Sequence, residues 1–168
     1  MRTGADAPGL APPGQAALNW SVERWFNLAP GQSAPTLDAL RGHVLLLHAF
    51  QMLCPGCVLH GLPQMQRVQQ VFAGMDLRLL GLHTVFEHHE AMGPASLQAF
   101  LHEFRVGFPV GVDRAEPGHA APRTMRDYAL QGTPSLLLID RQGDLRFHAL
   151  GRVEDLQLGA LIAQLLAQ

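Results

Sequence analysis

The sequence predicts an α/β fold in which a central mixed β-sheet carries helices on both faces. Two observations predict it. Apolar runs of strand length alternate with segments of helical periodicity from residue 19 onward, and the chain ends in a strand hairpin followed by a helix. A strand–helix–strand unit joins parallel strands and a hairpin joins antiparallel ones, so together they give a mixed sheet. The 168 residues fit one domain, and 48% hydrophobic with 15% charged residues is typical of a globular chain.

The first 18 residues are expected to form a flexible tail, with the domain at residues 19–168. The segment Met1–Ala17 is rich in Ala, Pro and Gly and has no continuous apolar core after Arg2, so it does not match a secretory signal. No stretch approaches the roughly 20 apolar residues of a membrane span. These features predict a cytoplasmic protein without membrane contact, although a periplasmic chain that has lost its signal would look the same.

The composition excludes several classes of function. The formal net charge is −2, so we expect no nucleic-acid partner. All 12 basic residues are Arg, and the absence of Lys excludes Schiff-base chemistry and a P-loop lysine. Two cysteines are too few for a multi-disulfide scaffold or an all-cysteine zinc site.

The first half of the domain contains three predicted strands and two predicted helices. Ser21–Asn27 reads as an edge strand, and the apolar run His43–Phe50 reads as a strand buried on both faces. Spacings of three and four predict an amphipathic helix over Pro55–Phe72, then a strand over Leu77–His83 and a helix over Pro94–Phe104. The inward positions of the two helices are Val58, Leu62, Met65, Val68 and Phe72, and Leu97, Phe100, Leu101 and Phe104.

The second half is expected to complete the sheet and to cover it. Phe108–Val112 is a short extended piece, and Ala121–Ala129 a short helix. Ser135–Asp140 and Leu145–Leu150 are strands joined by a Gly-containing turn, which indicates a hairpin. Val153–Leu166 is the closing helix, with Leu158, Leu161, Ile162 and Leu165 facing inward.

The two cysteines form a C-x-x-C pair, Cys54-Pro55-Gly56-Cys57, between a buried strand and a helix. A helix N-terminus offers unpaired N–H groups and the positive end of a dipole, which stabilise a thiolate. The thiolate is the reactive form of cysteine, and the spacing lets the two sulfur atoms join. Two other readings stay open: two buried cysteines that happen to be close, and a metal site of Cys54, Cys57 and His60, which lacks a fourth ligand.

With these pieces the sequence resembles the thioredoxin-fold proteins of the TlpA-like and redoxin group over about residues 20–167. The matching pieces are Leu40-Arg41-Gly42, the strand up to Phe50, the C-x-x-C pair, the strand ending at His83, Val106–Asp113, and Gly132-Thr133-Pro134 before the last strands. The resemblance implies a thiol–disulfide oxidoreductase in which Cys54 attacks and Cys57 resolves. Its partners would be protein or small-molecule thiols and disulfides.

The same resemblance implies a cis peptide bond at Pro134 beside the cysteines. Thr133 would then present its backbone to a substrate, and Thr133, Pro134, Pro55 and Gly56 are the expected substrate-binding residues. An ordinary trans Thr-Pro loop is the alternative. No cofactor or metal is expected, because the cysteines themselves carry the electrons. The oligomeric state is not predicted.

Three positions depart from the family pattern. Leu53 replaces the Trp that commonly precedes the first Cys, and His48 stands where the family commonly has Asp or Asn. The helix proline, Pro63, falls six residues after Cys57 where the family has five, so either the helix is bulged near Gly61 or its kink is displaced by one residue.

His48 and Glu87 are the further candidate catalytic residues. His48 is expected on the central strand beneath the active-site helix, where burial would keep its imidazole neutral and suited to accept a proton, or it is an ordinary core histidine. Glu87 follows the second buried strand, where a carboxylate could tune a thiol pKa or move a proton. A solvated loop, or a metal site with His88 and His89, are the other readings of that segment.

Two functions compete with disulfide exchange. A peroxiredoxin-like antioxidant peroxidase needs a Thr or Ser three positions before the reactive Cys, and this chain has Gln51 there, with Leu47 in place of the expected Pro. A non-catalytic binding or redox-sensor module would use the fold for docking, and would keep its function without Cys54.

Overall fold

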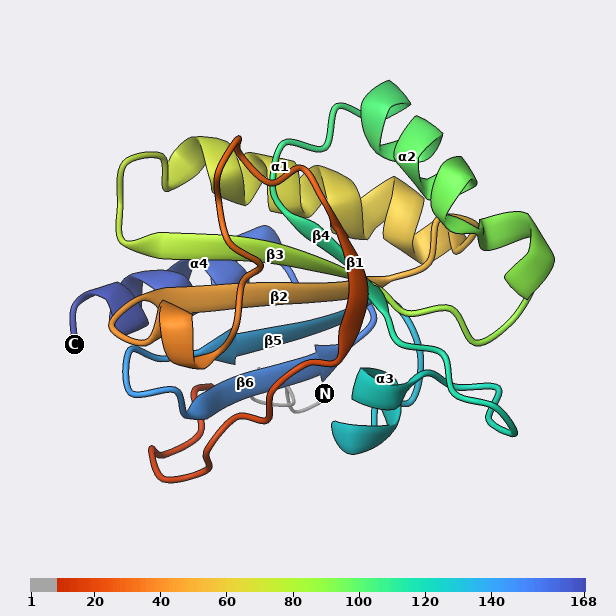
Figure 1. Ribbon diagram of the computed structural model, residues 1–168. Helices are drawn as coiled ribbons and strands as arrows, with labels where there is room; N and C mark the ends of the chain where they lie inside the picture. Colours follow the sequence, from red (N-terminus) through yellow and green to blue (C-terminus); the bar gives the residue numbers. More distant parts are fainter. Residues whose placement is uncertain (1–8) are drawn as a thin grey trace, which may run out of the picture.

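The computed structural model describes residues 9–168 and contains one six-stranded sheet in the order β1-β4-β3-β2-β5-β6 (Figure 1). At its centre β2 (Val44–Phe50) runs parallel to β3 (Leu77–His83) and antiparallel to β5 (Ser135–Ile139). Every residue of β2 is buried, as the continuous apolar run predicts for a strand covered on both faces.

Three shorter strands complete the sheet. β4 (Val110–Asp113) runs parallel to β3, and β1 (Val22–Phe26) lies antiparallel to β4 as the edge strand. β6 (Leu145–Leu150) pairs antiparallel with β5 and forms the opposite edge. The mixed sheet, the hairpin and the edge position of β1 are thus confirmed.

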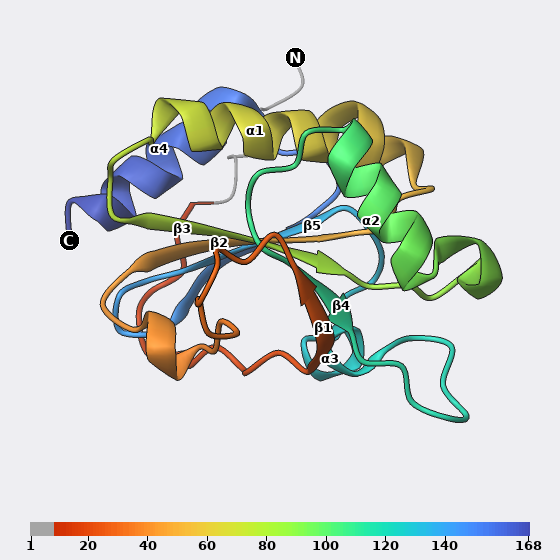
Figure 2. The same ribbon diagram turned by 45° about the horizontal axis from the view of Figure 1, so that its top comes forward.

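The helices lie on both faces of the sheet (Figure 2). The larger layer packs three helices in one apolar cluster with the sheet, and the short helix α3 lies on the other face with the segment before β2. The helices of the larger layer are α1 (Leu62–Val71), α2 (Pro94–Glu103) and α4 (Asp155–Leu166), and α3 is Arg123–Asp127. Three short helical turns complete the described part of the chain: the 3₁₀ helices η1 (Asp38–Leu40) and η3 (His89–Met92), and the π-helix η2 (Cys57–Gly61).

Alternation along β2 divides the core into two parts. Leu46 and Phe50 pack with the α1 layer, whereas Leu47 and Ala49 pack on the α3 side. The inward positions predicted for the closing helix are all buried. Phe104 was expected on the inward face of α2, but it is 44% exposed because the helix ends at Glu103 and Phe104 forms its C-cap.

The chain before β1 lies along the outer edge of β6. The Ala11 N–H donates to Arg146 O at 2.6 Å, and Ala16 forms a bridge with Asp144. The part of the expected tail before residue 9 lies outside the described residues, and the domain boundary after residue 18 stays a prediction. Within the described chain, no helix is long and apolar enough to cross a bilayer.

Candidate active site between β2 and α1

The two cysteines lie where the loop after β2 turns into a helix, at the carboxyl ends of β2 and β3. The turn is tight, because the Cys54 N–H donates to Gln51 O at 3.1 Å and the Val58 N–H donates to Cys54 O at 3.1 Å. Both cysteines are free thiols. Cys54 is half-buried and Cys57 is completely buried, so only the first can meet another molecule.

The Cys54 sulfur has a polar partner on each side. The Cys57 N–H donates to Cys54 Sγ at 3.3 Å, and the Cys54 thiol donates to Thr133 O at 3.5 Å. An N–H group at a helix start that points at a sulfur atom stabilises negative charge on it. The Cys54 sulfur therefore lies at the start of the helix, between one donor and one acceptor, on the accessible side of the turn.

Cys57 has a different environment. The pKa of its thiol is raised to about 12, first by burial and next by the hydrogen bond with the Cys54 side chain, against smaller lowering effects of Gln51 and Thr133. The Cys57 thiol is thus protonated at neutral pH. It can attack another sulfur only when a nearby group removes its proton.

The segment Thr133-Pro134 lies against the first turn of this helix. The Thr133–Pro134 bond is cis, as the resemblance implies, and Pro134 is buried. A Cβ atom on Gly56 would lie 3.3 Å from Pro134 Cδ. Gly56 therefore allows the helix and the proline to approach closely, which brings the Thr133 carbonyl to Cys54.

The helix after Cys57 contains an extra residue, and that residue lies over His48. The sequence left open either a bulge near Gly61 or a displaced kink, and the structure has the bulge: η2 is a π-helical turn that ends at Gly61. A Cβ atom on Gly61 would lie 2.5 Å from His48 Nε2. The bulge and the missing side chain together make room for the imidazole ring, which stacks on Phe50 with ring centroids 5.5 Å apart.

His48 lies beneath the active-site helix, as expected, and is completely buried. Neither ring nitrogen has a hydrogen-bond partner within residues 9–168. Burial lowers the pKa of His48 to about 3, so the imidazole is neutral at any pH near neutrality. Its position fits the prediction, whereas a part in catalysis stays a prediction.

Glu87 is connected to the cysteine loop by Gln51. The Gln51 side chain is buried, accepts the Phe86 N–H at Oε1 (3.1 Å) and donates from Nε2 to Glu87 Oε1 (3.3 Å). Sequence reasoning noticed Gln51 only as a position without a hydroxyl group. The structure shows that its amide ties the exposed Glu87 carboxylate to the loop that contains Cys54.

His83 is a buried residue of the site that sequence reasoning missed. It ends β3, its Nε2 accepts the Met52 N–H at 3.2 Å, and its ring lies 5.3 Å from that of Phe50. Burial lowers the pKa of His83 to about 4, so the ring stays neutral and keeps its acceptor nitrogen. The only signal in the sequence was a polar residue at the end of an otherwise apolar strand.

The candidate metal ligands are not brought together. His60 is exposed on η2, and His88 and His89 are exposed around η3, where His89 Nε2 lies 3.1 Å from Ala120 O. Within residues 9–168, no three His, Cys, Asp or Glu side chains are arranged to hold a metal ion.

A cavity and several exposed leucines lie around the cysteine turn. A cavity of about 580 Å³ adjoins Pro134, between the start of α1 and the segment 151–156. Four leucines around it and around the cysteine loop are more than half exposed: Leu53, Leu59, Leu150 and Leu156. Exposed apolar side chains and a cavity whose lining includes Arg67, Arg152, Glu154 and Asp155 therefore lie close to the cysteine turn.

Comparison with known proteins identifies the family. No family model matches the chain, and no curated protein does. The crystal structure of a thioredoxin-like superfamily protein is 55% identical, with a TM-score of 0.87 over 92% of this chain and 98% of that one. A thiol-disulfide isomerase from Corynebacterium glutamicum is 41% identical, with a TM-score of 0.83 over 94% and 97% of the two chains.

A more distant structure, StoA from Bacillus subtilis, is 19% identical and shares the fold, with a TM-score of 0.62 over 89% of this chain and 98% of that one. The sequence identities to the thioredoxin-like superfamily protein and to the thiol-disulfide isomerase are high enough to show a shared family as well as a shared fold. Each match covers almost the whole length of both chains. The chain belongs to the thioredoxin-like family of thiol–disulfide oxidoreductases.

Proposed function

We propose that Cys54 and Cys57 are the redox couple of this enzyme and that it exchanges disulfides with an extended segment of a protein partner. The proposal rests on the contrast between the environments of the two sulfur atoms. Cys54 is accessible and accepts a helix N–H group, whereas Cys57 is buried and protonated. A couple of this kind has one atom that meets the partner and one that completes the reaction.

In the reducing direction the Cys54 thiolate attacks one sulfur of a partner disulfide. The partner S–S bond breaks, its second sulfur leaves as a thiolate and takes a proton, and a mixed disulfide forms. Cys57 then loses its proton and attacks Cys54 Sγ, which breaks the mixed disulfide and releases the other partner sulfur. Two electrons pass to the partner and the Cys54–Cys57 disulfide remains; the reverse sequence oxidises a dithiol.

The partner would bind along the surface beside Cys54. The Thr133 carbonyl and the Pro55–Gly56 turn flank the sulfur. The exposed leucines suit apolar side chains of the partner, and the cavity next to Pro134, whose lining includes charged residues, suits polar ones. We assign the proton transfer at Cys57 to the Glu87 carboxylate, which Gln51 holds at this loop, and we assign to His48 the support of the helix turn that bears Cys57. A cytoplasmic location is part of the same proposal.

The test is a trapping experiment with the two serine variants. With insulin as the disulfide substrate, Cys57→Ser should accumulate a mixed disulfide through Cys54, because the resolving thiol is missing. Cys54→Ser should form none and should lose turnover. Mass spectrometry of the trapped species under non-reducing conditions identifies the linked residue.

Three results would overturn the proposal: mixed disulfides through Cys57, turnover that survives Cys54→Ser, or the absence of any Cys54–Cys57 disulfide after oxidation. The reaction of Cys54 with hydrogen peroxide distinguishes a disulfide-exchange enzyme from a peroxidase. We expect Cys54 to be unreactive at micromolar peroxide, since Gln51 supplies no hydroxyl group and its amide is engaged with Phe86 and Glu87.

A further inference from the structure

The amino-terminal half of β3 has an open edge, at the end of the sheet opposite Cys54. β2 pairs with β3 along its whole length, Leu77–His83, but β4 pairs with it only over Gly81–His83. Residues 77–80 therefore have a neighbouring strand on one side only. Such a stretch presents main-chain groups in the arrangement that another strand needs.

The alternation of hydrogen bonds identifies the free groups. The Val44 N–H donates to Asp76 O, and at the other end the Thr84 N–H donates to Phe50 O. Even-numbered residues of β3 therefore direct their main-chain groups to β2, and odd-numbered ones direct theirs the other way. Leu77 and Leu79 consequently point an N–H and a C=O each toward the open side, without a main-chain partner within residues 9–168.

Pro109 is the reason that β4 stops where it does. The Gly81 N–H donates to Pro109 O at 2.8 Å, which is the last bond of the β3–β4 ladder at this end. In a parallel ladder the next bond would come from the N–H of residue 109 to Leu79 O. Proline has no N–H group, so this bond cannot form and the ladder ends.

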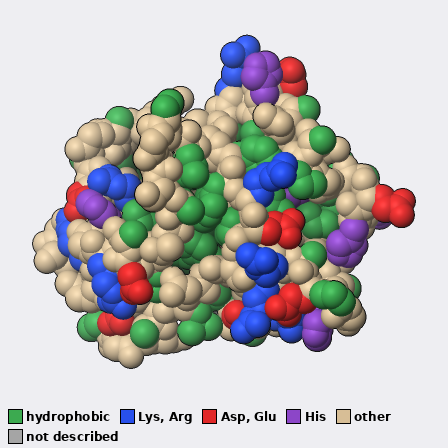
Figure 3. Space-filling model, viewed as in Figure 1, with side chains coloured by type: hydrophobic (Ala, Val, Ile, Leu, Met, Phe, Trp, Pro, Cys, Tyr) green, Lys and Arg blue, Asp and Glu red, His purple; other side chains and the backbone are tan. Residues whose placement is uncertain are grey.

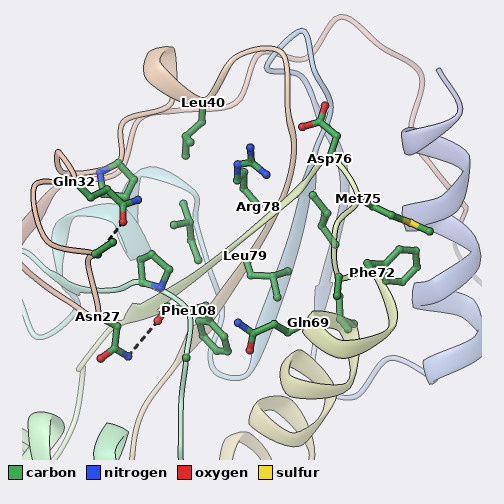
Figure 4. A pocket seen from close by; sticks show the side chains of 18 of the residues that line it. Asn27, Gln32, Leu40, Gln69, Phe72, Met75, Asp76, Arg78, Leu79 and Phe108 are labelled. Carbon is green, nitrogen blue, oxygen red and sulfur yellow. Dashed lines mark hydrogen bonds between the residues drawn. The ribbon is translucent and has the colours of Figure 1, made fainter.

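A cavity of about 780 Å³ lies at this edge and has walls on both faces of the sheet (Figure 4). Gln69 of α1 and Phe72, its C-cap residue, form one wall, and Gln32 and Leu40 from the segment before β2 form the other. From the viewpoint of Figure 1, hydrophobic side chains gather along the middle of the molecular surface (Figure 3). The cavity is thus a slot that continues the plane of the sheet, and not a pocket on one of its faces.

Among the described residues, the Arg78 side chain lies at the slot without an acidic partner. Arg78 lines the cavity and is exposed (Figure 4). Within residues 9–168 its guanidinium group has no ion pair or hydrogen bond. The neighbouring Asp76 is already paired with His43 and Arg141. Since Arg78 and Leu79 point to opposite faces, a strand in the slot would meet a positive charge on one face and apolar side chains on the other.

The other edges of the sheet are protected. Residues 11–17 lie along the outer edge of β6, and β1 carries two exposed charged residues, Glu23 and Arg24, a usual means of keeping strands apart. We propose that the open edge of β3 is a docking site for an extended segment of a partner protein, which pairs with the main chain of Leu77 and Leu79 and places an acidic side chain, flanked by two apolar ones, beside Arg78.

The test uses the ¹⁵N-labelled full chain and the capped pentapeptide Thr-Leu-Glu-Leu-Thr. Binding should slow amide hydrogen exchange at Leu77 and Leu79 and shift their NMR signals. Replacing the Glu of the peptide by Lys should weaken binding by about twofold to fivefold, the range for one cross-strand charge pair. Methylating the main-chain nitrogens of the peptide should abolish binding, because the side chains remain but the strand pairing is lost.

Arg78→Glu should reverse the preference between the two peptides. Arg24→Glu, the same charge change on β1, is the matched control and should leave the preference unchanged. Insulin reduction through Cys54 should be equal in both variants, so failure here is distinct from failure of the redox assignment. The proposal is wrong if Leu77 and Leu79 show no protection, if both peptides or the methylated peptide bind equally well, or if protection appears without peptide as the chain self-associates.

Discussion

Cys54 and Cys57 are three residues apart on one turn of chain, yet they have opposite environments. Cys54 is half-buried, accepts a helix N–H and lies beside the Thr133 carbonyl, whereas Cys57 is fully buried and burial raises the pKa of its thiol to about 12. The difference supports the division of roles proposed above, in which Cys54 meets the partner and Cys57 completes the reaction. Cys54 comes just before the helix and stays at the surface, whereas Cys57, the first residue of η2, is enclosed by the apolar core.

The largest expected effect is on thiol reactivity. A thiol with a pKa of about 12 is ionised in roughly one molecule in 10⁵ at pH 7, and Cys57 is also shielded from reagents. In the reduced protein, iodoacetamide should therefore label Cys54 at least about a hundredfold faster than Cys57. Peptide mapping after timed labelling measures both rates, and raising the pH should accelerate labelling of Cys57 up to about pH 12. Comparable rates at pH 7 would contradict the assigned roles.

Gly61 is the position at which the Cys57 turn can be disturbed most. A Cβ atom there would lie 2.5 Å from His48 Nε2 and 2.8 Å from Cε1, and the ring is held in the core against Phe50. We expect Gly61→Ala to lower the free energy of unfolding by about 1–3 kcal/mol, as overpacking does. Urea denaturation followed by circular dichroism measures the change.

Two further variants test this explanation. Gly159 lies inside α4 with open space around its Cα, so Gly159→Ala should raise stability by about 0.5–1 kcal/mol, the helix propensity difference. In a double-mutant cycle, His48→Ala should recover part of the loss caused by Gly61→Ala, because it removes the clashing ring. Strict additivity of the two changes would show that the contact between them is not the cause.

The third prediction concerns pH. The pKa of His48 is about 3 in the folded chain and 6.5 in a free histidine, so between these values the unfolded chain binds a proton that the folded chain does not. The free energy of unfolding is at its full value above pH 6.5 and falls as the pH falls toward 3, by at most about 1.4 kcal/mol per pH unit for this group.

His48→Leu separates this effect from the other titrations. The variant should lose stability more slowly than the original chain between pH 6.5 and pH 4, and His83, whose pKa is lowered to about 4, should keep its own contribution. Denaturation curves across this range measure the two slopes. Identical slopes would mean that His48 is solvated in solution and does not support the turn in the neutral form.

The strands and the cysteine turn could be predicted because each follows from a local pattern. β2 and β3 are continuous apolar runs, and the C-x-x-C pair marks a helix start. The contacts between residues that are distant in the sequence could not be predicted in this way. His48 and the shifted Pro63 appeared in the sequence as two separate departures from the family pattern, whereas the structure joins them: the bulge that displaces Pro63 puts Gly61 over the ring. The hydrogen bond that the Met52 N–H donates to His83 depends on strand pairing, which local spacing does not encode.

The smallest expected effect is at Glu87. Glu87→Gln keeps an oxygen that can accept the Gln51 amide, at 3.3 Å in the original chain, and removes only the charge. A base in direct contact with the reacting group raises the reaction rate roughly 10²-fold to 10⁴-fold. Because Glu87 is exposed and reaches the loop only through Gln51, we expect the release of the mixed disulfide by Cys57 to slow by about threefold to tenfold. Attack by Cys54 should be unchanged, because its sulfur is stabilised by the Cys57 N–H group. Stopped-flow measurement of the two steps separates them, and equal slowing of both would reduce Glu87 to a distant charge that acts on the whole site.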